Sequence, residues 1–104
     1  IDTSYLYSAR DVMAEIAPLA PTDAKLFYNL GLTLARTGEV TEAIKILKKA
    51  VELKPDFRDA SFTIALLEIE NGNLAEAKTQ LEYILNSIDP DDILAKQQLE
   101  ELGF

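Results

Sequence analysis

Apolar residues return at intervals of three and four along most of this chain, the spacing of one face of an α-helix. The segment 24–57 holds two such series. They are Phe27, Leu30, Gly31 and Leu34, and then Ala43, Leu47, Ala50 and Val51. Most of the polar and charged residues lie at the positions between them, among them Asn29, Thr33, Lys45, Lys48 and Lys49. The pattern predicts two amphipathic helices, at about 24–37 and 41–53.

Residues typical of helix ends separate the two predicted helices. Gly38 stands where a helix must stop in a left-handed conformation, which glycine adopts at little cost. Thr41 offers a hydroxyl near the start of the second helix, and Pro55 ends it because proline has no amide hydrogen. We therefore predict an antiparallel hairpin, with the small residues Gly31 and Ala43 where the helices cross.

The landmarks of this hairpin return 34 residues later. The shift carries Gly38 onto Gly72 and Ala43 onto Ala77. It also aligns Glu42 with Glu76, Leu47 with Leu81, Leu30 with Ile64 and Gly31 with Ala65, and backwards it aligns Ala43 with Ala9, Leu47 with Met13 and Pro55 with Pro21. The chain thus contains an internal sequence repeat with a period of 34 residues.

In period and in the order of its landmarks, the sequence resembles the tetratricopeptide repeat family. The matching residues are Phe27 in the aromatic position, Leu30-Gly31, Leu34 in the tyrosine position, Ala43, Leu47, Ala50 and Pro55. The second copy departs from the pattern, with Ser61 in the aromatic position, Glu68 in the tyrosine position and Pro90 one residue late. The resemblance covers essentially the whole chain.

The resemblance implies an all-α fold, a right-handed solenoid of antiparallel helix hairpins with about six helices. We expect a single domain over 1–104, made of a half repeat or N-terminal helix (1–23, helical from about 4 to 17), repeats at 24–57 and 58–90, and a capping helix in 91–104. The later helices are predicted at about 58–71 and 74–86. The segment 89–92 should start the last helix, with Pro90 in its first turn and Ile93 and Leu94 on its apolar face.

Composition excludes most catalytic chemistry. The 104 residues include no cysteine and no histidine, so disulfides, thiolate metal sites and serine–histidine or cysteine–histidine pairs are excluded. Asp89, Asp91 and Asp92 lack the glycine and the distal glutamate of a calcium loop, and helix capping is the better interpretation. We expect no enzyme, no metal site and no cofactor.

Charge and hydropathy narrow the range of partners. A formal charge of −8 repels nucleic acid and anionic membrane surfaces. No apolar run approaches the roughly 20 residues of a membrane span, so direct membrane insertion is not expected. We expect a soluble domain, either cytoplasmic or attached to a membrane protein. The sequence starts at Ile1 without a secretory signal pattern, and we interpret it as a piece of a longer protein.

The resemblance implies a non-catalytic module that binds a protein or peptide in a concave groove lined by the first helix of each repeat. Carried onto this sequence, the groove residues are Lys25, Tyr28, Asn29, Leu32, Ala35 and Arg36 in one repeat, and Asp59, Phe62, Thr63, Leu66, Ile69 and Glu70 in the next. Apolar side chains would form its floor and charged ones its rim. The alternative is a structural role at the end of a larger array or of a bacterial membrane or envelope protein, with self-association as a homodimer.

Overall fold

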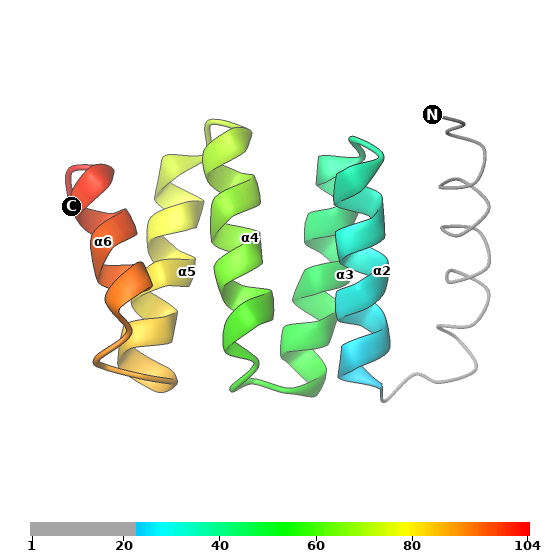
Figure 1. Cartoon of the computed structure of the whole chain (residues 1–104), viewed down its shortest axis with the longest axis horizontal. Coiled ribbons are helices and arrows are strands. Elements are labelled where there is room, and N and C mark those ends of the chain that lie inside the picture. The colour runs from blue at the N-terminus through cyan, green and yellow to red at the C-terminus, as the bar shows by residue number, and fades with distance from the viewer. Residues whose placement is uncertain (1–22) are drawn as a thin grey trace. The chain divides into compact units, whose positions relative to one another are not determined.

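The computed structural model describes residues 23–104, which form five helices and no strand (Figure 1). The chain divides into two compact units between Lys54 and Pro55. The first contains α2 (Ala24–Arg36) and α3 (Val40–Leu53), and the second contains α4 (Arg58–Glu70), α5 (Leu74–Ser87) and α6 (Ile93–Glu101). The all-α prediction is confirmed over this range. The helix predicted at about 4–17 lies outside the described residues.

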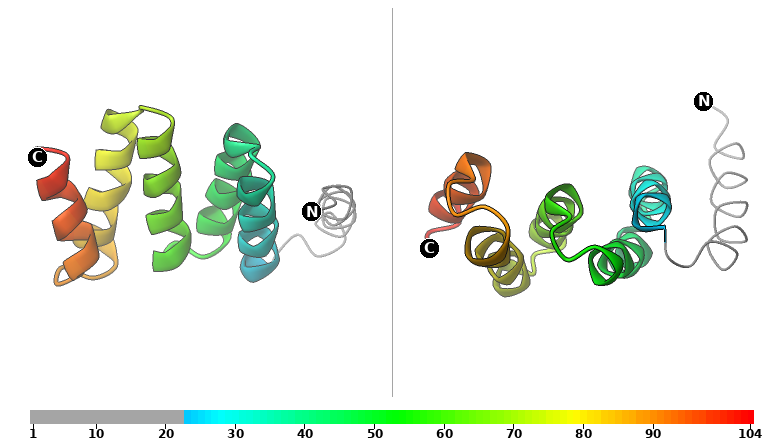
Figure 2. Two further views of the ribbon diagram at one scale, coloured as in Figure 1. Left: turned by 45° about the horizontal axis from the view of Figure 1, so that its top comes forward. Right: turned by 90° about the horizontal axis from the view of Figure 1, so that it is seen from below.

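In the first unit, α2 and α3 pack side by side as an antiparallel hairpin (Figure 2). Gly38 has a φ of +83° in the turn between them. The amide of Glu39 donates to Leu34 O at 2.9 Å and that of Gly38 to Ala35 O at 3.1 Å. This pair of bonds is the Schellman motif, which satisfies the last carbonyls of α2. The predicted glycine stop is therefore confirmed.

The two helices cross closely at Gly31. A Cβ placed on Gly31 would lie 2.6 Å from Cγ of Leu47 and 3.4 Å from the carbonyl oxygen of Ala43. Leu47 and Ala43 are both fully buried. The predicted crossing is confirmed, and the structure adds that the Leu47 side chain occupies the space that a larger residue at position 31 would need.

The residues at the helix ends account for the start of α2 and the end of α3, and the start of α3 differs from the prediction. Asp23 caps α2 by accepting a hydrogen bond from the amide of Leu26 at 3.0 Å. Helix α3 ends at Leu53, and Lys54 has φ −140° and ψ +88°, outside the helical region that a following proline disfavours. The predicted cap at Thr41 is wrong, because the Schellman turn brings the chain into α3 at Val40 and leaves Thr41 inside the first turn.

The second unit packs α5 against both α4 and α6. Its core is a cluster of Ala65, Leu81, Ile84 and Ala95, with Phe62, Leu85, Ile88, Leu99 and Leu102 packed against it. Gly72 has a φ of +80° and forms the same turn between α4 and α5 that Gly38 forms in the first unit. The hydroxyl of Tyr83 donates to the Pro55 carbonyl at 2.7 Å and fixes the start of this unit to α5.

Helix α6 starts later and buries different residues than the sequence predicts. Its first residue is Ile93, and Pro90 lies in the turn before it. Ala95 is fully buried, whereas Ile93 is 68% exposed and Leu94 50% exposed. With Asp92 as the cap of the helix, the residues of α6 that pack against the core are Ala95, Leu99 and Leu102. Ile93 and Leu94, the first two residues of the helix, lie outside this set.

Candidate functional site

The predicted groove residues of the first unit lie on the part of α2 that faces away from the hairpin core. Phe27, Leu30, Gly31 and Leu34 are the buried residues of this helix. Lys25, Asn29 and Arg36 are exposed, and Tyr28, Leu32 and Ala35 are half-buried. The exposed strip of α2 thus combines partly accessible apolar side chains with two cations and an amide.

The predicted groove residues of the second unit divide between surface and core. Asp59 and Glu70 are exposed, Leu66 is 40% exposed, and Thr63 and Ile69 are half-buried. Phe62 is half-buried because its ring packs against the core cluster. The guanidinium carbon of Arg58 lies 4.3 Å from the centre of that ring, a cation–π contact. Phe62 therefore contributes to the packing of this unit, and Leu66 is the exposed apolar residue of the strip.

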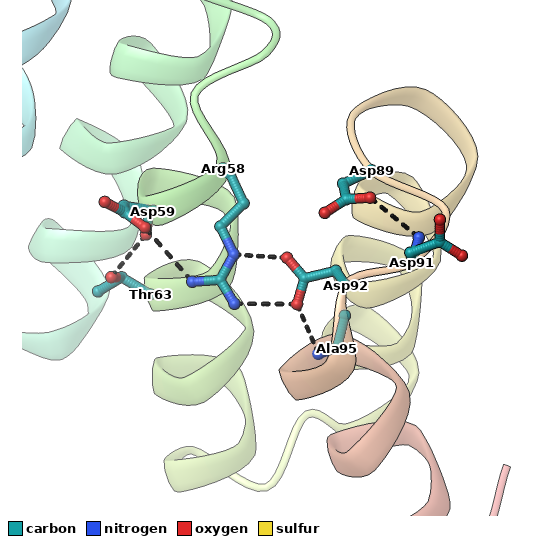
Figure 3. Close-up of polar contacts among 7 residues, drawn as sticks. All are labelled: Arg58, Asp59, Thr63, Asp89, Asp91, Asp92 and Ala95. Carbon is teal, nitrogen blue, oxygen red and sulfur yellow. Dashed lines mark hydrogen bonds and ion pairs between the residues drawn. The ribbon is translucent and has the colours of Figure 1, made fainter.

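An ion pair joins the first turns of α4 and α6 (Figure 3). Arg58 Nε donates to Asp92 Oδ2 at 2.7 Å and Arg58 Nη2 donates to Asp92 Oδ1 at 3.0 Å, which is the two-pronged geometry that guanidinium and carboxylate favour. Asp92 Oδ1 also accepts from the amide of Ala95 at 3.0 Å and so caps α6. The predicted capping role of this acidic segment is confirmed for Asp92, which is only 8% exposed.

The contacts around Arg58 extend to the exposed strip of α4. Arg58 Nη1 lies 3.3 Å from Asp59 Oδ1, and the Thr63 hydroxyl donates to the Asp59 carbonyl at 2.8 Å (Figure 3). Asp89 accepts from the amide of Asp91 at 2.9 Å in the turn before α6. The two bonds from Arg58 to Asp92 join the first turn of α4, where Asp59 is exposed, to the start of α6, where Ile93 is exposed.

Sequence reasoning missed the Arg58–Asp92 pair. The two residues are 34 positions apart, one full repeat, so they hold the same place in successive repeats. A search for opposite charges separated by one period would have found them. Sequence reasoning also treated Ser61 and Glu68 only as departures from the family pattern, whereas both side chains are buried in α4.

The ion pair changes how both side chains titrate. Hydrogen bonds from Arg58 lower the pKa of the Asp92 carboxyl, although burial works against them. The bond to Asp92 raises the pKa of Arg58, so the arginine stays charged throughout the pH range of folded proteins. A carboxyl with a lowered pKa in the folded state stabilises the fold above its unfolded pKa, and this contribution is lost as pH falls through the folded pKa.

We therefore expect acid to remove the contribution of Asp92. The free energy of unfolding of the natural chain should exceed that of Asp92→Asn by a constant amount from about pH 5 to pH 7, above the ordinary carboxyl value of about 3.9. The difference should shrink as pH falls below that value. Urea unfolding of both chains at each pH measures it. A difference that stays the same down to about pH 2 would contradict the role given to the charge of Asp92.

The described residues offer no metal site and no membrane span. No group of three His, Cys, Asp or Glu side chains within 23–104 is arranged to hold a metal ion. In the same range, no helix has both the length and the apolar character needed to cross a bilayer. What this part of the chain offers is helix surface, apolar in places and charged around them.

Comparison with protein families agrees with the helix hairpins and the glycine turns. Two tetratricopeptide repeat models match the sequence, one over residues 34–99 and the other over residues 8–56. The first covers more than half of the chain. The chain belongs to the tetratricopeptide repeat family. These matches confirm the resemblance found in the sequence. Members of this family are generally non-catalytic and bind proteins or peptides.

Individual proteins of known sequence or structure are also similar to this chain. The human protein O-mannosyl-transferase TMTC3 is 35% identical over 92 residues, which span 80% of this chain and 10% of that protein. The crystal structure of MamA superposes with a TM-score of 0.84 at 26% identity, over 93% of this chain and 56% of that one. The chain therefore spans a tenth of the first relative and about half of the second.

A third likeness shows the fold alone. The type III secretion chaperone SycD of Yersinia enterocolitica, solved in complex with a peptide of the translocator YopD, superposes with a TM-score of 0.75 at 20% identity. The likeness spans 97% of this chain and 76% of that one. These tetratricopeptide neighbours confirm the fold class predicted from the sequence, a fold of antiparallel helix hairpins.

Proposed function

We infer that this chain binds a peptide or a helix of another protein on the exposed strips of its first helices, α2 and α4. The observation that carries the proposal is the partial exposure of apolar side chains between charged ones on these strips. Leu32 is half-buried between exposed Asn29 and Arg36, and Leu66 is 40% exposed between exposed Asp59 and Glu70. Apolar anchors with a polar rim suit the capture of an amphipathic segment.

The arrangement within each hairpin supports the same conclusion. The core-facing residues of α2 pack against α3 and those of α4 pack against α5, which leaves Leu32 partly exposed and Leu66 40% exposed on the other side of these helices. Family membership supports a binding role, and the SycD structure shows that a protein of this fold was captured with a peptide. The single domain expected from the sequence is part of the same proposal, as are the groove residues of α2 in the first unit and those of α4 in the second.

Selection from a random peptide library on the immobilised chain tests this function. We expect enriched peptides whose binding falls at least tenfold, which is about 1.4 kcal/mol, in the double variant Leu32→Ser with Leu66→Ser. The matched control is Lys45→Ser with Leu74→Ser, which changes exposed residues of α3 and α5. Thermal melts of both variants check that each remains folded at the binding temperature.

Two outcomes would reject the proposed function. The first is a library that yields no peptide binding above background. The second is a set of peptides whose affinity falls equally in the strip variant and in the control, because binding would then not depend on the first helices.

A further inference from the structure

The whole negative charge of the chain belongs to its second unit. Residues 55–104 contain eleven acidic and three basic side chains, a formal charge of −8, whereas residues 1–54 contain seven of each. Nine of the eleven acidic residues are exposed, all except Glu68 and Asp92. A difference of this size between two halves of one chain indicates a partner of opposite charge for the charged half.

The three cations of this unit are already engaged within it. Arg58 binds Asp92 and Asp59. Lys96 Nζ lies 3.9 Å from Asp91 Oδ1, and Lys78 Nζ lies 4.8 Å from the centre of the Phe104 ring. The remaining exposed carboxylates therefore present an acidic surface with little internal compensation.

Part of this acidic surface lies on both sides of one exposed apolar side chain of α4, that of Leu66. Asp59, Leu66 and Glu70 are exposed and lie at intervals of seven and four residues, which places them on one stripe of the helix. With a rise of about 1.5 Å per residue, the Asp59 and Glu70 positions lie roughly 10 and 6 Å along the helix from Leu66. A carboxylate thus stands on each side of the apolar side chain.

The same positions of the repeat are exposed on α6. The 34-residue shift that relates Arg58 to Asp92 carries Asp59 onto Ile93 and Leu66 onto Glu100. Ile93 is 68% exposed, and Glu100 is exposed. The Arg58–Asp92 pair fixes the first turns of the two helices to each other (Figure 3). Gln97 is exposed on α6, four residues after Ile93 and three before Glu100. We call Asp59, Leu66, Glu70, Ile93, Gln97 and Glu100 together the α4–α6 face.

We propose that the α4–α6 face holds a basic amphipathic helix of a partner protein. Its apolar side chains pack on Leu66 and Ile93, and its lysines or arginines lie against Asp59, Glu70 and Glu100. Charge complementarity selects this occupant, since an acidic helix would meet like charges that cost binding energy. The proposal rests on the proposed function and deepens it by naming the charge and the shape of the ligand.

Synthetic peptides on the full chain test the proposal. The probe is a helix-forming peptide of about 18 residues with leucine on one face and lysine elsewhere, labelled for fluorescence anisotropy. One comparison peptide has glutamate in place of lysine, and another has the same composition with the leucines scattered around the helix. We expect the leucine–lysine peptide to bind, to lose roughly tenfold in affinity between about 50 and 300 mM salt, and to exceed both others by at least tenfold.

Paired variants separate the α4–α6 face from general attraction to an acidic protein. The double variant Glu70→Gln with Glu100→Gln should lower the affinity for the leucine–lysine peptide about fivefold. The control, Glu76→Gln with Glu82→Gln, removes the same charge from exposed positions of α5 and should change this affinity less than about twofold. Leu66→Ala should weaken binding about fivefold, and Leu74→Ala should not. The second pair is matched, because Leu66 is 40% exposed and Leu74 42% exposed.

Several results would overturn the proposal. The proposal is wrong if the leucine–lysine peptide does not bind, if the glutamate peptide binds equally well, or if the two glutamine double variants lose affinity equally. It is also wrong if the chain forms a dimer in sedimentation experiments and Leu66→Ala abolishes that dimer. In the last case the occupant is a second copy of this chain. If library peptides still bind through α2 and α4 in these cases, the proposed function stands and only the basic helix is rejected.

Discussion

Gly31→Leu is expected to lower the free energy of unfolding by about 1–3 kcal/mol. The Cβ alone would lie 2.6 Å from Cγ of Leu47, inside the distance at which real side chains pack, and a leucine adds three further carbons at the same place. Leucine is the better helix former by about 1 kcal/mol, so the measured loss understates the steric conflict. Thermal unfolding should show a fall of about 4–8 °C for each kcal/mol lost.

A double-mutant cycle with Leu47→Ala identifies the contact that is responsible. Leu47→Ala removes a fully buried side chain and should itself cost about 2–5 kcal/mol. In that background, Gly31→Leu should cost at least 1 kcal/mol less than in the natural chain, because the conflicting atoms are gone. Strictly additive losses, or an unchanged melting temperature for Gly31→Leu, would show that the two residues do not meet at the crossing.

Asp92→Ala is expected to destabilise the chain by about 2–4 kcal/mol. The substitution removes the cap of α6 and leaves the Arg58 guanidinium without its two bonds of 2.7 and 3.0 Å. Arg58 is partly exposed, so water replaces some of what it loses, and the cost stays below that of a fully buried pair. Urea unfolding near pH 7 measures the change.

Asp92→Asn separates the two roles of this residue. Asparagine caps helices about as well as aspartate, so this variant should keep the bond to the Ala95 amide and lose mainly the charge. It should fall between the natural chain and Asp92→Ala in stability. Arg58→Met should also destabilise, because it leaves a buried carboxylate unpaired. Equal stability of the natural chain and Asp92→Ala would contradict the importance of this pair.

Much of the fold follows from the sequence because backbone chemistry determines it. Glycine at positions 38 and 72 is needed for a positive φ, and Pro55 forces Lys54 out of helical angles. Helical spacing then separates the buried residues of α2 and α3 from the polar ones, and the repeat transfers the result to α4 and α5. These are local effects that need no knowledge of distant contacts.

The features that the sequence did not predict depend on contacts between helices. The start of α6 at Ile93 depends on Asp92 acting as a cap while it binds Arg58, a residue 34 positions away. Phe62 matches an exposed groove position by its place in the repeat, yet its ring packs against the core cluster and beneath Arg58. Helical periodicity places a residue on a side of its helix, and neighbouring helices then decide how much of it remains exposed.

Amide chemical shifts test directly whether the strips of α2 and α4 bind a peptide. A ¹⁵N-labelled sample of the chain would be titrated with the tightest peptide from the library. If these strips bind the peptide, the largest shift changes fall on 25–36 in α2 and 59–70 in α4, with little change on the exposed positions of α3 and α5. Changes concentrated on α3 and α5, or spread evenly over all helices, would contradict binding at these strips.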